Sequence, residues 1–456
     1  MYRLLLLFVA LFAGSPPSLA GEPVTAPSAQ RGYKLLVEKA YLPPDFDQET
    51  FDAAWKYWPE TLRSEAEKAT PSQRRQLAFA RYGLTPRPND PSKPLQYVVD
   101  EQGNWTMNCF ACHGGHVPTA KNENQTWPGA PNSQFALQTL TEETRQAKAD
   151  LQKALTRMDL GSAFIPLGTT DGTTNAVMFG VVLLALRDAD LNLLPRPAIP
   201  EMTHHDMDAP PWWHFRRKKM LYIDGFAEKG HRGLMQFNLV RTNGPEKFRE
   251  WENDFRDIYA YIESIPVPKY PFAMDTRLAD QGRLAFNRVC ADCHGTYGPG
   301  GQYPEKTVSI DEVGTDRVRL DGLTPAHRAA YGKGWFAEYG NNENIDDPKG
   351  YVAPPLDGVW ASGPYFHNGS VPTLWHVLHL NQRPAIWKRT SAGYDQARVG
   401  PAVEELAELP PGKQTGAEQR RYFDTNAFGK GNAGHLFADA LTAEEKLAVL
   451  EYLKTL

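Results

Sequence analysis

Apolar residues recur along most of the chain with the three-to-four-residue spacing of amphipathic helices, and strand-like alternation is sparse. The clearest example is residues 246–264. Its apolar residues fall on one helical face: Phe248, Trp251, Phe255, Ile258, Tyr259 and Ile262. The pattern therefore predicts a mainly α fold.

Capping signals place further helices. Thr70-Pro71-Ser72 predicts the start of a helix over residues 73–82 that stops at Gly83. Thr174 is expected to cap an apolar helix that runs to Arg187. The other predicted helices cover residues 141–158 and 275–289, and a capping box at 442–445 begins the last one.

Three prolines within six residues make 265–271 a stiff linker, and we place a domain boundary there. The predicted domains are residues 21–266 and 273–456. Residues 257–262 and 450–453 look like equivalent helices that close the two units. A chain of 456 residues is long enough for two or three such domains.

The first residues predict export. A positive Met1–Arg3, an apolar run from Leu4 to Ala13, and Ser18-Leu19-Ala20 before Gly21 form a signal peptide over residues 1–20. We expect a periplasmic or secreted protein. The other long apolar run, 176–186, is about half a membrane span, so no membrane span is expected.

All four cysteines lie in two copies of one pattern, C-x-x-C-H. The copies are Cys109, Cys112 and His113, and Cys290, Cys293 and His294. This is the attachment pattern of c-type haem, because two thiols one turn apart reach the two vinyl groups and the next imidazole reaches the iron. We expect two covalently bound haem c groups, haem 1 and haem 2, with His113 and His294 as proximal ligands.

Other chemistry explains these residues less well. A zinc site pairs two C-x-x-C motifs without needing a histidine after each, and a thioredoxin-type disulfide needs a βαβ context that the pattern does not predict. The near-balance of 49 basic and 54 acidic residues gives a net charge of −5, which argues against nucleic-acid binding through a basic surface.

The chain resembles the bacterial di-haem cytochrome c peroxidase/MauG superfamily, and within it the rubber-oxygenase-like branch. The resemblance rests on both C-x-x-C-H motifs, on residues 355–374 (PLDGVWASGPYFHNGSVPTL), and on residues 431–435 and 451–456. It implies two cytochrome c-like haem domains with long loop insertions. It also implies unequal haems.

By this resemblance, haem 1 has an open distal face that activates hydrogen peroxide or dioxygen, and haem 2 transfers electrons from a small cytochrome c or cupredoxin. The function expected is a peroxidase-like oxidoreductase. The alternatives are a non-catalytic periplasmic electron-transfer cytochrome and a dehydrogenase subunit. Family members often hold Ca²⁺ between the domains, for which oxygen donors near Asn243 are candidates.

The resemblance also implies roles for single residues. His435, in a glycine-rich loop, is expected as the distal ligand of haem 2, with His367 as its rival. Tyr365 and His367 are otherwise expected to have hydrogen-bonding or structural roles. Trp213 is a candidate aromatic between the haems, with the basic run 216–219 pairing to propionates; a core tryptophan beside a solvated charge run explains it equally well.

The distal side of haem 1 is expected between residues 200 and 245. Phe237 would line it and leave the iron open, whereas His231 or Met235 as a ligand would close it. The sequence leaves these possibilities side by side.

Overall fold

The structure is a computed structural model that describes residues 26–198, 201–412 and 414–456. The predicted signal peptide, residues 1–20, lies outside these ranges. Within them, no helix is both long enough and apolar enough to cross a membrane.

The fold is mixed α/β, with 43% of the chain in helices and 14% in strands of small antiparallel sheets. The prediction of a mainly α fold was therefore incomplete. The sequence missed the strands because most have only two or three residues, too few to show alternation.

The elements have the following bounds. The α-helices are α1 (Ala29–Glu38), α2 (Gln48–Ala53), α3 (Glu60–Lys68), α4 (Pro71–Tyr82), α5 (Phe110–His113), α6 (Leu137–Asp150), α7 (Arg157–Phe164), α8 (Ala176–Ala185), α9 (His231–Met235), α10 (Pro245–Glu250), α11 (Glu252–Ser264), α12 (Thr276–Val289), α13 (Ala291–His294), α14 (Ile310–Val313), α15 (Val318–Gly322), α16 (Pro325–Lys333), α17 (Leu374–Leu378), α18 (Gly416–Gln419) and α19 (Ala443–Leu453). The 3₁₀ turns are η1 (Ala54–Tyr57), η2 (Trp212–Arg217), η3 (Gln236–Asn238), η4 (Trp335–Gly340), η5 (Val359–Ala361), η6 (Leu380–Gln382) and η7 (Leu436–Ala440).

The strands form two three-stranded sheets, ordered β1-β5-β4 and β15-β14-β16, and several two-stranded ladders. Their bounds are β1 (Phe46–Asp47), β2 (Pro86–Arg87), β3 (Asp90–Pro94), β4 (Tyr97–Val99), β5 (Asn104–Met107), β6 (His116–Pro118), β7 (Asn124–Thr126), β8 (Thr173–Thr174), β9 (Met207–Asp208), β10 (Met220–Leu221), β11 (Ala227–Glu228), β12 (Thr307–Ser309), β13 (Gly350–Val352), β14 (Ile386–Asp395), β15 (Gly400–Leu406) and β16 (Phe423–Asp424).

Several predicted helix ends are confirmed. Thr70 and Gln73 form a capping box at the start of α4, which ends at Gly83 with a left-handed φ of 65°. Thr442 and Glu445 form the same box on α19. The helix predicted from 275 is α12, which Asp275 caps. Short polar side chains at these positions satisfy the free N–H groups of the first turn.

Two predicted helices are broken. The segment 141–158 is not one helix: α6 ends at Asp150, and the chain folds back into α7, where Asp159 pairs with the buried Lys148. A straight helix would leave that lysine unpaired. The segment 246–264 divides at Trp251 into α10 and α11. The apolar helix is confirmed as α8 and is shorter than predicted, but its N-cap is Asn175, without a side-chain cap, and not Thr174.

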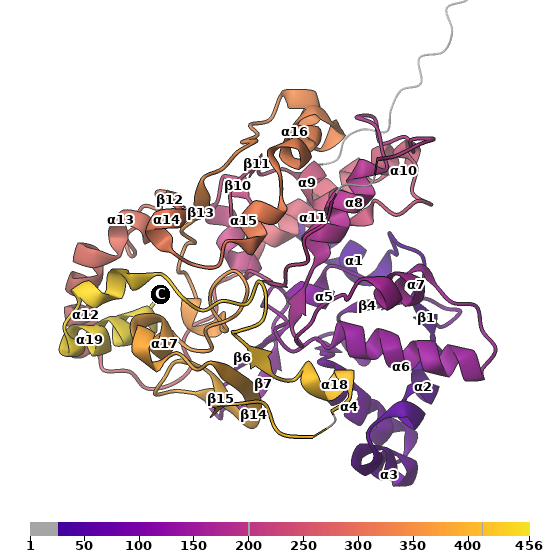
Figure 1. Cartoon of the computed structure of the whole chain (residues 1–456), viewed down its shortest axis with the longest axis horizontal. Helices are drawn as coiled ribbons and strands as arrows, with labels where there is room; N and C mark the ends of the chain where they lie inside the picture. Colours follow the sequence, from indigo (N-terminus) through magenta and orange to yellow (C-terminus); the bar gives the residue numbers. More distant parts are fainter. Residues whose placement is uncertain (1–25, 199–200, 413) are drawn as a thin grey trace, which may run out of the picture.

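The two halves of the chain contain matching helix crossings, α1 on α11 and α12 on α19 (Figure 1). A glycine lies at each contact. A Cβ on Gly32 would stand 2.1 Å from the carbonyl oxygen of Asp257, and one on Gly282 would stand 1.8 Å from that of Ala448. The second helix of each crossing is one of the two that the sequence identified as equivalent. The sequence did not predict α1.

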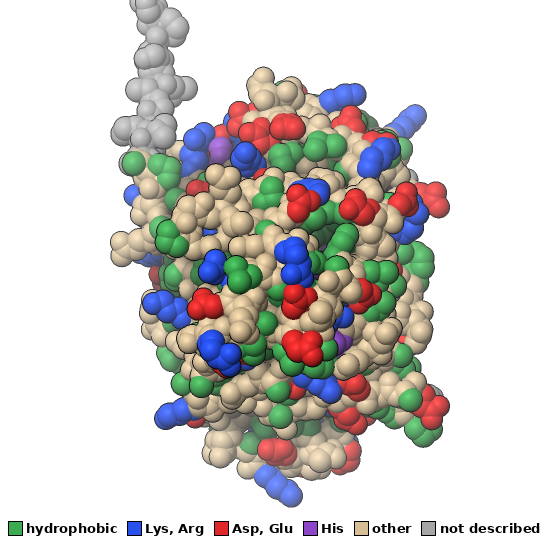
Figure 2. Space-filling model, turned by 90° about the vertical axis from the view of Figure 1, so that its left-hand side faces the viewer, with side chains coloured by type: hydrophobic (Ala, Val, Ile, Leu, Met, Phe, Trp, Pro, Cys, Tyr) green, Lys and Arg blue, Asp and Glu red, His purple; other side chains and the backbone are tan. Residues whose placement is uncertain are grey.

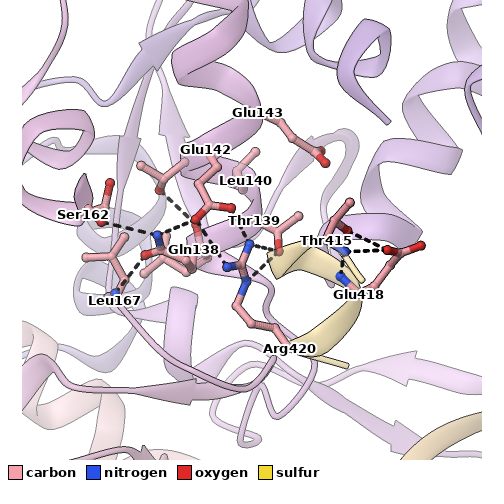
Figure 3. A network of polar contacts seen from close by, with 12 residues as sticks. Gln138, Thr139, Leu140, Glu142, Glu143, Ser162, Leu167, Thr415, Glu418 and Arg420 are labelled. Carbon is pink, nitrogen blue, oxygen red and sulfur yellow. Dashed lines mark hydrogen bonds and ion pairs between the residues drawn. The ribbon is translucent and has the colours of Figure 1, made fainter. Parts of the chain in front are cut away.

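The two halves interlock. One hydrophobic core contains buried residues from Leu36 to Leu453. Arg420, just after α18, donates to Thr139 of α6, from Nη2 at 3.0 Å and from Nε at 3.2 Å, and pairs with Glu142 (Figure 3). Arg389 of β14 donates to Ser133 Oγ at 2.7 Å. The division into domains 21–266 and 273–456 remains a prediction.

The close contact at Gly282 is testable. In Gly282→Ala, the new methyl group forces α12 away from α19, and we expect a loss of about 1–3 kcal/mol in the free energy of unfolding. The matched control is Gly161→Ala in α7, where a Cβ meets no atom within 4 Å. Urea titration of both variants measures the difference, and equal stabilities would contradict the contact.

Candidate haem sites

The first motif forms one helical turn. Cys109 precedes α5, which ends at His113. His113 Nδ1 lies 3.0 Å from the carbonyl oxygen of Pro210, and its ring stacks on Trp212 with ring centres 4.7 Å apart. Burial lowers the pKa of His113 to about 4, although the Pro210 contact opposes this shift. The ring is therefore neutral and oriented, as a metal-binding imidazole must be.

The second motif repeats this geometry. Helix α12 runs into Cys290, and α13 carries Cys293 and ends at His294. His294 Nδ1 lies 2.9 Å from the carbonyl oxygen of Pro354. Burial lowers the pKa of His294. In both motifs a proline carbonyl thus holds Nδ1 of the histidine and leaves Nε2 free to bind a metal.

His435 faces His294. The two ring centres are 6.1 Å apart, and the ring planes are tilted by 57°. If two imidazoles bind one metal ion from opposite sides through bonds of about 2 Å each, their ring centres lie about 6 Å apart. The observed separation matches this value. Within the described chain, Nδ1 of His435 is buried without a hydrogen-bond partner. Burial lowers the pKa of His435 to about 3, so this ring is neutral as well.

The loop that carries His435 is held on several sides. Arg383 donates from Nη1 to the carbonyl oxygens of Asn432 and Gly434, at 2.6 and 2.9 Å. The backbone N–H of His435 donates to the Val313 carbonyl at 2.6 Å. Buried Asn368 donates to the carbonyl oxygens of residues 429 and 431. These bonds hold His435 at a φ of 53°, which costs a non-glycine residue conformational energy.

A hydrogen-bonded contact connects the two segments that orient the histidines of the motifs. Trp213 Nε1 donates to the carbonyl oxygen of Asp357 at 2.7 Å, and His214 Nε2 lies at the same distance from that oxygen. Gly358, with a φ of 62°, leaves room for the indole: a Cβ there would stand 2.9 Å from its Nε1. Trp213 is three residues from Pro210, and Asp357 is three residues from Pro354. The contact therefore joins the two carbonyl-bearing segments.

The basic run after Trp213 is not simply solvated. Arg217 pairs with the Asp357 carboxylate at 2.7 Å. Lys218 Nζ donates to the Tyr222 carbonyl at 3.0 Å, and burial lowers the pKa of Lys218. Trp213 itself is buried. The segment both fills core space and bridges the two motifs.

Tyr365 and His367 lie in the same long segment. Tyr365 OH donates to the Val359 carbonyl at 2.9 Å. The His367 ring packs on Tyr351, with centres 4.6 Å apart, and the His367 carbonyl accepts from the N–H of Asp208 at 2.9 Å. The structure thus brings His435, and not His367, to the ring of His294. The role of the pair remains a prediction.

The three residues expected at the distal side of haem 1 differ in burial and in their contacts. His231 Nε2 lies 3.2 Å from Glu252 Oε1, which also accepts from Arg232. Met235 is fully buried in the main core. Phe237, in η3, is 44% exposed. In the described part of the chain, these side chains share no hydrogen bond or ring contact with the first motif, and their catalytic role remains a prediction.

The residues fit haem c. In each motif two thiols and an imidazole lie on one turn, and all four cysteines are free of disulfides. A cavity of about 580 Å³ adjoins the second motif and is lined by Val289, Val313, Gly434 and Phe437, among others. Its volume lies within the range of cofactor sites.

The structure does not single out a calcium site. Within the described ranges, no group of three or more His, Cys, Asp or Glu side chains could hold a metal ion. The Asn243 amide nitrogen donates to the carbonyl oxygens of Tyr41 and Asn238, both at 2.9 Å. Calcium binding therefore remains a prediction.

Sequence reasoning missed the groups that orient the ligands. They include the carbonyl groups of Pro210, Pro354 and Asp357 and the side chains of Arg383 and Asn368. A backbone carbonyl leaves no mark in the residue type, so no motif could reveal it. The nearest available signal was the unusual segment 355–374 itself.

Comparison with known proteins supports the haem interpretation. Residues 350–388 match the family described as RoxA-like, cytochrome c-like, and this stretch contains Pro354 and Asp357. The match supports a haem-containing oxidoreductase of that kind, with covalently bound haem c.

Two proteins of Sinorhizobium fredii are similar to the chain. It is 27% identical over 289 residues to the uncharacterized protein y4iM, covering 54% of this chain and 64% of that protein. It is 28% identical over 255 residues to the uncharacterized protein y4iJ, covering 41% of each. The chain thus spans less than two thirds of the length of these relatives.

Proposed function

We propose that this protein is an exported di-haem c-type cytochrome that acts as a peroxidase-like oxidoreductase. The haem at Cys109–His113 would react with hydrogen peroxide or dioxygen, and the haem at Cys290–His294 would transfer electrons. The observation that carries the proposal is the facing pair His294 and His435. In the described chain, His113 has a ring contact with Trp212 and none with a second imidazole.

The inequality of the two sites determines their chemistry. Haem supplies the redox reaction, and an iron with two protein ligands has no free position, whereas an iron with one does. At the second site, Arg383 and Asn368 hold the His435 loop so that the ligand stays in place. At the first site, the Pro210 carbonyl orients His113.

Trp213 would couple the two sites. Its indole N–H bonds the Asp357 carbonyl, which lies three residues from the carbonyl that orients His294. A buried aromatic side chain with a fixed hydrogen bond reorganises little when charge moves nearby. This supports the role expected for Trp213 from the sequence.

The electron donor would be a small cytochrome c or cupredoxin. The cavity beside the second motif is lined by Arg288, Asp311 and Glu312 as well as apolar residues. Figure 2 shows one face of the molecule, where acidic, basic and hydrophobic side chains are intermingled. A mixed face of this kind suits a transient contact more than strong steering by charge of one sign.

The second candidate is a non-catalytic electron-transfer cytochrome, or an electron-transfer subunit of a dehydrogenase. The observation that favours this candidate is the burial of Met235 in the core next to η3. A sulfur ligand from Met235 would occupy the open position on the first haem iron. The two candidates differ in the number of irons that accept an external ligand.

The first prediction is the number of haems. The purified protein should carry two covalently attached haems per chain, and Cys290→Ala/Cys293→Ala should carry one, because each pair of thiols holds one porphyrin. Pyridine haemochrome spectra against protein concentration measure the ratio. A ratio of one in the unaltered protein would overturn the di-haem assignment.

The second prediction concerns His435. The reduced protein should bind one carbon monoxide per chain, and His435→Ala should bind two, because removal of the distal imidazole opens the second iron. Optical titration gives both values. His327→Ala, which alters a histidine that caps α16, is the control and should bind one.

Binding of no carbon monoxide by the unaltered protein would favour the electron carrier. Binding of two would show that His435 is not a ligand.

The third prediction concerns Trp213. Trp213→Phe keeps a ring in the core but loses the hydrogen bond to Asp357, and we expect electron equilibration between the haems to slow several-fold. Rapid-mixing spectroscopy of the half-reduced protein follows this rate. The control is Trp375→Phe, which removes an indole bond to Gln382 far from this bridge. Equal rates in both variants would refute the coupling role.

A further inference from the structure

A buried charge cluster lies apart from the ligands described above. Asp224 accepts from two arginines through one oxygen: Arg328 Nη2 at 2.8 Å and Arg319 Nη1 at 3.3 Å. Asp224 and Arg319 are each 1% exposed, and Arg328 is 2% exposed. Arg319 belongs to α15 and Arg328 to α16 (Figure 1). Two cations and one anion leave one positive charge in the interior.

The two arginines are not equivalent. Arg328 also donates to the carbonyl oxygens of Leu323 and Leu320, so its guanidinium is fully engaged. Arg319 uses only Nη1 within the described chain, and its Nε and Nη2 are buried without a hydrogen-bond partner. Leaving buried donors of a charged group unpaired is costly, because each has lost its hydration.

The two free donors lie on one edge of the guanidinium plane. The N–H bonds of Nε and Nη2 point the same way from that edge, which is the geometry that binds both oxygens of a carboxylate. Asp224 occupies the Nη1 end and so fixes the orientation of the group. The uncompensated positive charge and the free Nε–Nη2 edge of Arg319 therefore both favour a carboxylate as the ligand.

The apolar cluster next to Arg319 lies beside the second haem site. Leu320, which follows Arg319, and Tyr351 belong to this cluster, against which Cys293 and Phe437 pack. Tyr351 OH accepts from the N–H of Leu320 at 3.1 Å. The Tyr351 ring also packs on His367, with ring centres 4.6 Å apart.

Other buried polar groups near α15 also lack partners. His205 Nε2 and Tyr222 OH are buried without partners in the described chain, and His205 packs against Gly322 at the end of α15. Asp224 Oδ1 is also unpaired and would bond a water that bridges it to the ligand. The basic residues that the sequence suggested for this purpose, 216–219, include Arg217, which is already paired with Asp357.

We propose that Arg319 binds a propionate carboxylate of the haem attached at Cys290 and Cys293 through its Nε–Nη2 edge, with Asp224 as the residue that orients it. This inference rests on the proposed function only in requiring that haem. The pairing neutralises a negative charge next to the iron. It should therefore raise the reduction potential of this haem, because the reduced state carries one positive charge less.

The test is the midpoint potential of the low-spin haem, measured by spectroelectrochemistry on the intact di-haem protein. Arg319→Gln should shift the ratio of reduced to oxidised haem toward oxidised by about tenfold at fixed potential, or about 59 mV for one electron. Asp224→Asn removes the competing anion and should shift the ratio the other way. Arg317→Gln is the control, since Arg317 is exposed and pairs with Asp321.

Resonance Raman spectra of the same samples give a second readout. The propionate bending mode should move in Arg319→Gln and stay in place in Arg317→Gln. Arg319→Lys keeps the charge but loses the bidentate edge, so it should retain most of the potential and change the mode. If Arg319→Gln does not fold, Asp224→Asn and Arg319→Lys still test the pairing.

Three outcomes would overturn the proposal. An unchanged potential and mode in Arg319→Gln would mean that water alone fills the space. A potential that responds to added acetate or chloride in the unaltered protein would mean that a free anion occupies the edge. A propionate mode that changes equally in Arg317→Gln would mean a nonspecific effect. A preparation with only one haem would instead fail the proposed function, which the haem count detects separately.

Discussion

The link between the two C-x-x-C-H motifs depends on the main-chain carbonyl of Asp357. It accepts hydrogen bonds from Trp213 and His214 and so fastens the segment that begins at Pro210 to the segment that begins at Pro354. Each of these prolines orients one proximal histidine. Both segments contribute side chains to one hydrophobic core. A single backbone oxygen thus links the two segments that orient the histidines of the motifs.

The second motif shows how much structure is needed to hold the one imidazole that faces it. His435 has a left-handed backbone conformation that its residue type disfavours, and hydrogen bonds from the side chains of Arg383 and Asn368 hold its loop. Such strain persists only where the surroundings over-determine the conformation. The first site has no comparable clamp on a facing side chain in the described chain.

The sequence predicted the groups that carry chemistry better than those that position them. Both C-x-x-C-H motifs could be named from residue type and spacing, His435 followed from the family resemblance, and helix ends with capping boxes could be placed. The short strands and the fold-back at Asp150 could not, since they depend on tertiary partners such as the pair Lys148 and Asp159. Nor could the proline carbonyls, because every residue has one. The catalytic role of Phe237 and His231 stays a prediction, because the side chain of Phe237 is 44% exposed and that of His231 lies against Glu252.

The most direct test of the central claim is a low-temperature EPR spectrum of the ferric protein as isolated, with haem content measured on the same sample. We expect one low-spin signal of the bis-histidine type, from a haem held by His294 and His435, and one high-spin signal that accounts for an equal amount of iron. Two high-spin signals would contradict the ligation of His435. Two low-spin signals would contradict an open first haem and make the protein an electron carrier.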